Sequence, residues 1–435
     1  MQKTGKKVMA LGLASLLAVS VSGCQSTQRT ADGRVKLSFQ IWDTAQRDGM
    51  QAIVDAYMEQ NPDVYIEVQV TSWDEYWTKL DAAAEANQLP DIFWMHTNQI
   101  LKYADYGMLA DVTDLYDGED PDYYTKHFSE ISLDNARGSD GRLYGVPKDK
   151  DTVGLVYSKT LFDQAGVSYP DETWTWDDLC EASAQIYEKT GYKTNIAYGD
   201  GEQYVEYLLR SKGITMFEDG RLGGEASDYV EYFDLYETGT KEGWLLSPSV
   251  FVERTKTTEL NPLVYGTSPE SMAWCTFHFS NQYPVLVESS AEDNEIGITT
   301  WPSNDVKKSN YLKPNQFLCV SRDARNPEEA IKFINWFNNS TECNDILLGE
   351  RGVPVSQSVA DAIASKLPQP EQEMIAYIND VASPNSSQVN PPATSGASEV
   401  IDLLNQLEEQ VCYGQMTAQE AGNELFTRGN EMMSK

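Results

Sequence analysis

The alternation of strand-like and helix-like segments over residues 35–94 is the feature that most restricts the fold of this chain. Residues 35–42, 64–70 and 89–94 carry the apolar patterns of buried strands. The segments between them, 46–60 and 76–87, have helical periodicity. The order βαβαβ predicts a parallel or mixed sheet covered by helices, in which ligands bind at the carboxyl ends of the strands.

Later segments predict a second α/β unit and several passages of the chain between the two units. We expect these passages at the apolar strands 145–157 and 296–301 and after a helix over 327–338. Three crossings predict a clamshell with a cleft at its hinge. Residues 383–395, rich in Pro, Ser and Asn, indicate an exposed loop. The other C-terminal segments are expected to be helices, over 358–366, 370–381, 398–412 and 417–433.

The N-terminus has the pattern of a secretory signal that ends in a lipobox. Three lysines precede an apolar stretch from Val8 to Val21, which is shorter than the roughly 20 residues that span a bilayer. Ser22-Gly23-Cys24 follows, so we expect residues 1–23 to be a signal peptide and Cys24 to carry a lipid. Residues 24–34 are small and polar and predict a flexible tether. About 400 residues remain, which is more than one hydrophobic core usually serves, so two domains are expected.

The charge of the chain restricts its partners. The formal net charge is −34, and removal of the signal lysines makes it more negative. Such a surface repels phosphates, so we expect no nucleic-acid partner, and anionic ligands are disfavoured without a local basic pocket. The 24 tyrosines and 10 tryptophans indicate flat apolar surfaces that bind uncharged rings.

The cysteines and histidines indicate neither a disulfide framework nor a metal site. Five widely spaced cysteines follow the lipobox, so we expect mostly buried thiols with at most one or two pairs. His96, His127 and His278 do not have the spacing of a zinc site. We therefore predict no metal and no cofactor. The five cysteines are Cys180, Cys275, Cys319, Cys343 and Cys412.

A series of short motifs, taken in their order along the chain, resembles one protein family. With the lipobox, they resemble the family 1 extracellular solute-binding proteins, the maltose-binding-protein-like sugar-binding lipoproteins of ABC importers. The motifs are Leu89-Pro-Asp-Ile-Phe-Trp-Met-His96, Tyr106-Gly-Met-Leu-Ala-Asp-Val112, Tyr144-Gly-Val-Pro147, Gly154-Leu-Val-Tyr-Ser-Lys159, Thr175-Trp-Asp-Asp-Leu179, Ser271-Met-Ala-Trp274, Ile296-Gly-Ile298, Trp301-Pro302 and Glu329-Ala-Ile-Lys-Phe-Ile334.

The resemblance implies a two-lobe α/β clamshell like that of the periplasmic binding proteins. Each lobe would be a mixed sheet flanked by helices and discontinuous in sequence, with 35–148 and 300–338 in lobe 1 and 149–299 and 339–435 in lobe 2. It also implies capture of a carbohydrate, an oligosaccharide, outside the cytoplasm and its delivery to ABC transporter permease subunits. We expect a monomer that contacts the cell membrane only through its N-terminal lipid.

The resemblance also assigns candidate ligand-binding residues. Most lie where relatives carry polar or aromatic contacts to a sugar. Relatives often place a Gly-x-Trp platform where this chain has Thr276-Phe277-His278, so either His278 or Trp274 would stack on the ligand. The candidates are Trp42, Asp43, Thr44, Trp94, His96, Thr97, Asn98, Asp151, Glu202, Tyr204, Trp274 and His278.

Each type of candidate also has a structural interpretation. The aromatic candidates could be core residues, Asp151 lies in a run of charges that water could solvate, and Glu202 could favour a helix N-terminus. We expect Trp174, Trp176 and Trp336 to be structural, with Thr175 capping a helix.

The residue types suit a sugar for reasons independent of any family. A pyranose has an apolar face for an aromatic plane and a rim of hydroxyls for carboxylates and amides, since an unpaired buried hydroxyl costs about 1–3 kcal/mol. A secreted glycosidase would use similar residues. No Ser-His-Asp set or Gly-x-Ser-x-Gly motif is present, and we predict a protein that is not an enzyme. Alternatives within the binding class are a polyamine, a peptide or a polyol.

Overall fold

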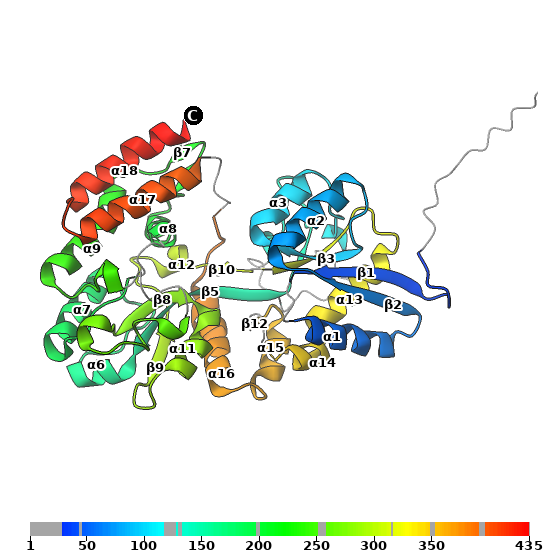
Figure 1. Ribbon diagram of the computed structural model, residues 1–435, viewed down its shortest axis with the longest axis horizontal. Coiled ribbons are helices and arrows are strands. Elements are labelled where there is room, and N and C mark those ends of the chain that lie inside the picture. The colour runs from blue at the N-terminus through cyan, green and yellow to red at the C-terminus, as the bar shows by residue number, and fades with distance from the viewer. Residues whose placement is uncertain are drawn as a thin grey trace, which may run out of the picture.

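Two α/β lobes lie side by side and are joined through one long strand, β5 (Asp149–Ser158) (Figure 1). The computed structural model describes residues 28–42, 46–116, 128, 133–196, 201–250, 258–314, 316–348, 353–390 and 396–434. The two-lobe α/β fold expected from the sequence is confirmed.

Lobe 1 is built on a mixed sheet with the strand order β2-β1-β3-β11-β4. Strand β1 pairs in parallel with β2 and β3, while β11 runs antiparallel to β3, so the predicted βαβαβ unit is confirmed. Alternate residues of β1 (Leu37, Phe39 and Ile41) are buried in the core. The elements are β1 (Val35–Ile41), α1 (Arg47–Gln60), β2 (Val64–Val70), α2 (Trp73–Glu85), β3 (Ile92–His96), α3 (Thr97–Asp105), α4 (Thr113–Tyr116), β4 (Val146–Pro147), β11 (Gln316–Val320), α13 (Pro327–Asn339) and α14 (Thr341–Leu347).

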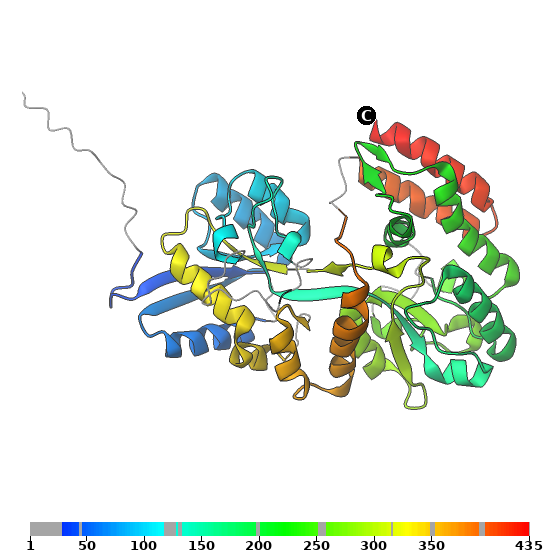
Figure 2. The ribbon, with the colours of Figure 1, turned by 180° about the vertical axis from the view of Figure 1, so that it is seen from behind.

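Lobe 2 is arranged around β5. The first half of β5 pairs with β10 (Leu312–Lys313) and β12 (Val353–Pro354), and its second half pairs with β8 (Cys275–Phe279) and β9 (Ile296–Thr299). A two-stranded sheet and helices complete the lobe, and Figure 2 shows them from behind. They are α6 (Lys159–Ala165), α7 (Trp176–Thr190), α8 (Gly201–Ser211), β6 (Phe217–Glu218), β7 (Arg221–Leu222), α9 (Ala226–Glu242), α11 (Tyr283–Ser289), α12 (Val306–Ser309), α15 (Gln357–Ala364), α16 (Gln369–Ala376), α17 (Ala397–Cys412) and α18 (Ala418–Met433).

We propose that two of the crossings lie further along the chain than the sequence predicted. Trp301 and Tyr311 are buried in the core of lobe 2, where the Trp301 ring stacks on Tyr204 at 4.7 Å between centroids. Cys343 instead belongs to the core of lobe 1, and Val355, which follows β12 beyond the end of that lobe, also packs into this core. The chain therefore passes between lobes at β4–β5, at β10–β11 and after α14. We propose 28–148 and 316–348 as lobe 1.

Residues 28–34 form a turn fixed to lobe 1, whereas the sequence predicted a tether through residue 34. The amide of Lys36 donates to the carbonyl of Gln28 at 2.9 Å, and Thr30 N donates to Arg34 O at 2.9 Å. The Arg34 guanidinium lies 5.0 Å from the centroid of the Tyr65 ring. These contacts hold the turn against β1 and β2, and the rest of the expected tether, with Cys24, lies outside the described residues.

The C-terminal helices and the cap at Thr175 agree with the sequence predictions. The Thr175 hydroxyl and the Asp178 carboxylate form a capping box at the start of α7. Trp174, Trp176 and Trp336 pack against the cores as predicted. All five described cysteines are free thiols, so none of the pairs allowed by the sequence forms. Within the described ranges, no helix is long and apolar enough to cross a membrane.

The close contact of α9 with α18 depends on Gly422, which gives a test of lobe 2 packing. A Cβ at Gly422 would lie 2.8 Å from Val230 N and 2.9 Å from Val230 Cα, so the two helices would have to separate. We expect Gly422→Ala to lower the free energy of unfolding by about 1–3 kcal/mol in urea titrations. Gly49→Ala, in α1 with open space around the new methyl, is the matched control and should be neutral or stabilising by up to about 1 kcal/mol. Equal changes in the free energy of unfolding in the two variants would contradict the prediction that Gly422 is needed for the close contact of α9 with α18.

Candidate functional site

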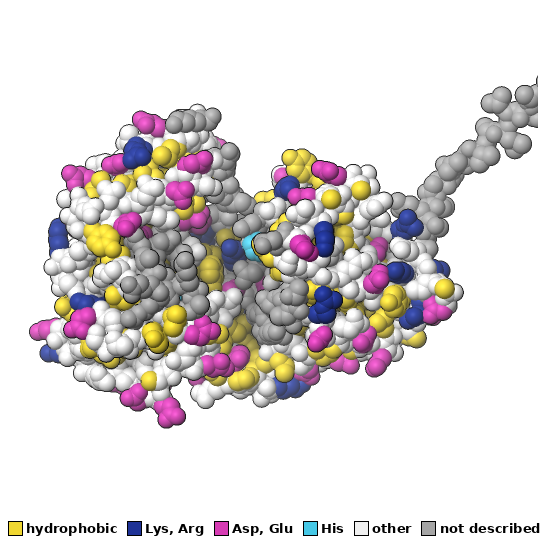
Figure 3. Space-filling view, in the orientation of Figure 1, with side chains coloured by type: hydrophobic (Ala, Val, Ile, Leu, Met, Phe, Trp, Pro, Cys, Tyr) yellow, Lys and Arg dark blue, Asp and Glu magenta, His cyan; other side chains and the backbone are white. Residues whose placement is uncertain are grey.

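A cavity of about 590 Å³ lies between the two lobes, and both contribute to its walls. Figure 3 shows the hollow between the lobes on one face of the molecule. Lobe 1 contributes Thr97 and Leu101 of α3, together with Asp134, Asn135 and Arg137. Lobe 2 contributes Glu202, Gln203, Glu206, Thr215, Met216, Phe217, Phe279, Tyr311, Lys313, Gln388, Val389 and Asn390.

The lobe 1 wall carries Asp134, Asn135 and Arg137 at the base of a hairpin over residues 136–144. Backbone hydrogen bonds from Gly138 N to Arg142 O and from Tyr144 N to Ala136 O, both 2.9 Å, close this hairpin. Arg137 Nε donates to Asp134 Oδ1 at 3.0 Å, so the ion pair restricts the guanidinium beside the cavity. Amide, carboxylate and guanidinium groups are thus placed together on this wall.

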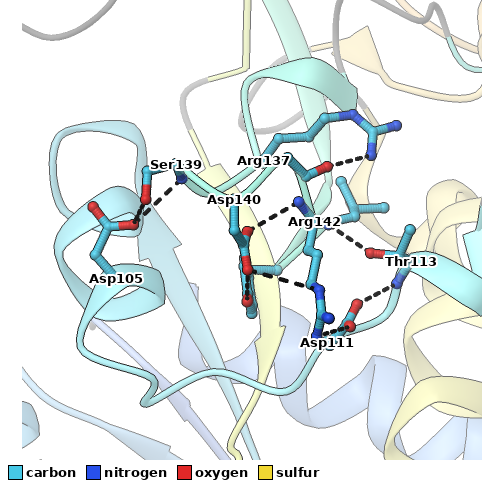
Figure 4. Close-up of polar contacts among 10 residues, drawn as sticks. Asp105, Asp111, Thr113, Arg137, Ser139, Asp140 and Arg142 are labelled. Atoms are coloured by element: carbon cyan, nitrogen blue, oxygen red, sulfur yellow. Dashed lines mark hydrogen bonds and ion pairs between the residues drawn. The ribbon is translucent and has the colours of Figure 1, made fainter.

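Polar contacts fix the tip of the same hairpin to the rest of lobe 1 (Figure 4). Ser139 Oγ donates to Asp105 Oδ1 at 2.7 Å, at the end of α3. Arg142 Nη1 donates to Asp111 Oδ2 at 3.2 Å, and its backbone amide donates to Asp140. The last bond, together with the Tyr144 hydroxyl, keeps the pKa of Asp140 below its usual range. The cavity wall therefore rests on an anchored loop.

The lobe 2 wall combines two carboxylates with one ammonium. Glu202 and Glu206 lie one turn apart on α8, and burial raises the pKa of both side chains. The negative charge of Glu206 raises the pKa of Glu202 further. Lys313 lies on β10, where burial lowers its pKa and the charges of Glu206, Asp151 and Glu202 oppose that change. The ammonium can donate hydrogen bonds to the hydroxyls of a neutral ligand, and the carboxylates can accept hydrogen bonds from them.

Aromatic rings supply the apolar part of the cavity. Phe217, Phe279 and Tyr311 line it, and the Lys313 ammonium lies 5.7 Å from the centroid of the Phe279 ring. Phe279 was not among the sequence candidates. The alternation of β8 could have identified it, because Phe277 and Phe279 share one face of the strand and His278 lies on the other.

A second aromatic group lies in lobe 1 next to α3. Trp73, at the start of α2, is 45% exposed, while Trp42 beside it is 8% exposed. The Trp73 ring lies 5.2 Å from Trp42 and 5.5 Å from His96, between centroids. His96 directly precedes Thr97, which lines the cavity. Trp73 follows the carboxyl end of β2, the sequence signal that could have identified it.

The other lobe 1 candidates are distributed between core and site. Trp94 is fully buried, with the Tyr76 hydroxyl donating to its carbonyl at 2.5 Å, so the structure places it in the core. His96 is partly exposed, and burial together with the nearby Lys313 charge lowers its pKa to about 4. Asp43, Thr44 and the side chain of Asn98 lie outside the described part of the chain.

Three of the lobe 2 candidates are packed rather than presented to the cavity. Tyr204 is 2% exposed, between Trp301 and Phe277. Trp274 is fully buried, and its Nε1 donates to Thr194 Oγ1 at 2.8 Å, so it has no face for a ligand. Asp151 is 1% exposed and accepts from the Thr152 amide and the Ser280 hydroxyl.

His278 and Glu202 have different outcomes. His278 is partly buried on the face of β8 opposite to Phe279, with its Nε2 3.1 Å from Asn261 Nδ2. Glu202 lines the cavity, and its contact with a ligand stays a prediction. Among the described side chains, no group of three or more His, Cys, Asp or Glu residues could hold a metal ion.

Comparison of the sequence with known proteins identifies the family of this chain, and the relatives named below are also described as binding proteins. The sequence profile described as bacterial extracellular solute-binding protein matches residues 52–373. A putative binding protein of Brucella abortus (strain 2308) is 21% identical over 394 residues, which cover 88% of this chain and 89% of the relative. The melibiose/raffinose/stachyose-binding protein of Bacillus subtilis (strain 168) is 25% identical over 180 residues, 40% of this chain and 39% of the relative.

A solved structure shares the fold over almost the whole chain. The family 1 extracellular solute-binding protein from Alicyclobacillus acidocaldarius has a TM-score of 0.81 and 22% identity. The similarity covers 92% of this chain and 99% of that protein.

The burial of His278 predicts a measurable dependence of stability on pH. Burial lowers its pKa from 6.5 to about 4, so the folded state binds fewer protons than the unfolded state between these pH values. Stability should therefore fall as the pH drops from 6.5 towards 4. In His278→Gln, the loss of unfolding free energy between pH 7 and pH 4 should shrink by roughly 2 kcal/mol in urea titrations. An unchanged loss in this variant would show that His278 is not the titrating group.

Proposed function

Because the chain belongs to the bacterial extracellular solute-binding proteins, we propose that it captures a carbohydrate, an oligosaccharide, and delivers it to the permease of an ABC transporter. The observation that carries this proposal is the cavity shared by the two lobes. Its walls combine aromatic rings with carboxylate and amide groups, and this combination suits a sugar ring with its rim of hydroxyls.

The polar residues of the cavity supply the groups that a sugar rim needs. Glu202 and Glu206 are acceptors, Lys313 is a donor, and Asn135 and Gln203 offer both kinds of group. Phe279 and Tyr311 offer rings to the apolar face of a pyranose. The name of the Bacillus subtilis relative, a melibiose/raffinose/stachyose-binding protein, points to ligands of this class.

The mechanism we propose is closure of the lobes around the ligand. The chain passes between the lobes at β5, which β10 and β12 flank, so a small change at these segments would rotate one cavity wall towards the other. A sugar that contacts both walls binds the closed state more tightly and shifts the population towards it. The closed form then docks on the permease.

We also propose that the protein is held at the cell membrane through a lipid on Cys24. The support is the lipobox in the sequence and the extracellular family of the chain. The membrane would then be contacted through the N-terminal lipid, and the folded part would stay monomeric.

A ligand screen tests the proposed function directly. The lipid-free mature chain would be melted with raffinose, lactose, diacetylchitobiose and longer oligosaccharides, with spermidine, a tripeptide and a polyol as comparators. A ligand at about 100 times its Kd should add about 2.7 kcal/mol to the folded state, seen as a higher Tm. A shift with one sugar class supports the proposal. A shift only with spermidine or the peptide would leave a binding protein and refute the carbohydrate assignment.

Among the aromatic residues of lobe 1, we expect Trp73 to contribute most to ligand binding. It is the exposed member of its aromatic group and adjoins His96, beside the cavity. Trp73→Ala should weaken binding of the sugar found in the screen about tenfold or more, measured by calorimetric titration. Tyr413→Ala removes a similarly exposed ring, 48% exposed, at the end of α17 and serves as the control. Equal affinity in both variants would remove Trp73 from the site.

A further inference from the structure

Arg210 is a buried cation directly behind the lobe 2 wall of the cavity. It lies in the last turn of α8, is 5% exposed, and packs against the ring of Tyr311 at 5.2 Å from the centroid. Tyr311 and Glu206, its neighbours on the cavity side, both line the cavity. Arginine keeps its charge when buried, so its donors must be satisfied by neighbouring groups.

The donors of Arg210 are directed mostly at one extended segment, residues 386–390, which we term the strap. Nη2 donates to Ser387 Oγ at 2.6 Å and to Gln388 O at 2.8 Å, and Nη1 donates to Asn390 Oδ1 at 2.7 Å. Nε donates to Ser309 O at 2.8 Å. A single guanidinium therefore ties the strap to α8 and to the end of α12.

The strap has its own tie to the same segment and reaches the cavity. Ser387 N donates to Asn310 O at 2.8 Å, which forms an isolated bridge between Tyr311 and Ser387. In Figures 1 and 2 the chain leaves α16 beside the hinge and runs up lobe 2 towards α17. Gln388, Val389 and Asn390 of the strap line the cavity. The position of this wall thus depends on Arg210.

The chemistry of the guanidinium also fixes which end of the Asn390 amide faces the cavity. A guanidinium has donors only, so the Asn390 oxygen must point to Arg210 and the amide nitrogen must point away from it. That nitrogen, Nδ2, is buried and faces the Glu206 carboxylate, where a hydrogen bond from the Asn390 side chain opposes the rise in the pKa of Glu206 that burial causes. The orientation of this amide therefore acts on Glu206, a carboxylate that lines the cavity.

We propose that Arg210 is a positioning residue of the interlobe site, which holds the strap in place and turns the Asn390 amide so that its nitrogen faces the Glu206 carboxylate of the cavity wall. This inference rests on the proposed function, since it assigns Arg210 a role in binding the same ligand. Lysine cannot replace arginine here, because an ammonium lacks the planar fork that reaches Ser309, Ser387 and Asn390 together.

Two variants of the full chain separate the position of the strap from the orientation of the amide. Arg210→Lys should speed amide hydrogen exchange in the strap without ligand and weaken sugar binding about tenfold. Asn390→Asp keeps an acceptor for Arg210 but removes the donor. It should leave strap exchange as in the wild type and still weaken binding about tenfold. The probes are raffinose, lactose and diacetylchitobiose, each followed by calorimetric titration. Arg221→Lys, at an exposed arginine of the same lobe, is the control and should change neither measurement.

The outcomes distinguish failure of this proposal from failure of the proposed function. Suppose that the wild type binds a sugar. If Arg210→Lys then has the same hydrogen exchange in the strap and the same affinity as the wild type, the role of Arg210 is overturned. Unchanged affinity in Asn390→Asp overturns the orientation of the amide. If the wild type binds none of the three sugars, the carbohydrate assignment fails, while the exchange data in Arg210→Lys still decide whether Arg210 holds the strap. Should Arg210→Lys fail to fold, Ser387→Ala, which removes one strap contact, replaces it in the exchange measurement.

Discussion

The structure depends on the burial of β5, a strand that both lobes share. It enters from lobe 1 with the charged run Asp149-Lys150-Asp151 and is buried throughout. Buried charges are costly unless they are paired, and each one here has a partner. Lys148 lies 3.4 Å from Asp149, Lys150 donates to Gln357 and Asn379, and Asp151 accepts from Ser280. These bonds tie β5 to segments from distant parts of the sequence, so the hinge and both lobes are specified together.

The same run explains part of what could and could not be read from the sequence. The periodicities of residues 35–94 and of the C-terminal third are local, and they predicted the elements there well. Charges on a strand suggested a solvated segment or a ligand contact at Asp151. The charged run is buried because β10 and β12 pair with this part of β5 and Ser280, after β8, bonds to Asp151. Local sequence patterns reveal none of these partners.

The site was predicted in outline but not residue by residue. Glu202 and Thr97 line the cavity, as expected from their places at a helix start and a strand end. Trp94, Tyr204 and Trp274 are core residues, because a strand or helix alternates its faces and a motif does not say which face meets the cavity. Phe279 and Trp73 were missed for the same reason. The strap could not be anticipated, since its position is set by Arg210, far from it in sequence.

The turn at residues 28–34 has a geometric consequence for how the molecule is held. Gln28 is already bonded to β1 through Lys36, so the chain is part of lobe 1 from this residue on. Gln28 is the fourth residue after Cys24, and a fully extended chain covers at most about 3.6 Å per residue, or about 14 Å over these four steps. With the lipid on Cys24, as proposed, this distance would keep the end of lobe 1 closer to the lipid-bearing residue than the length of a usual strand, which is about 17–20 Å. If the proposed anchoring and delivery hold, the protein would therefore have to meet its transporter close to the membrane surface.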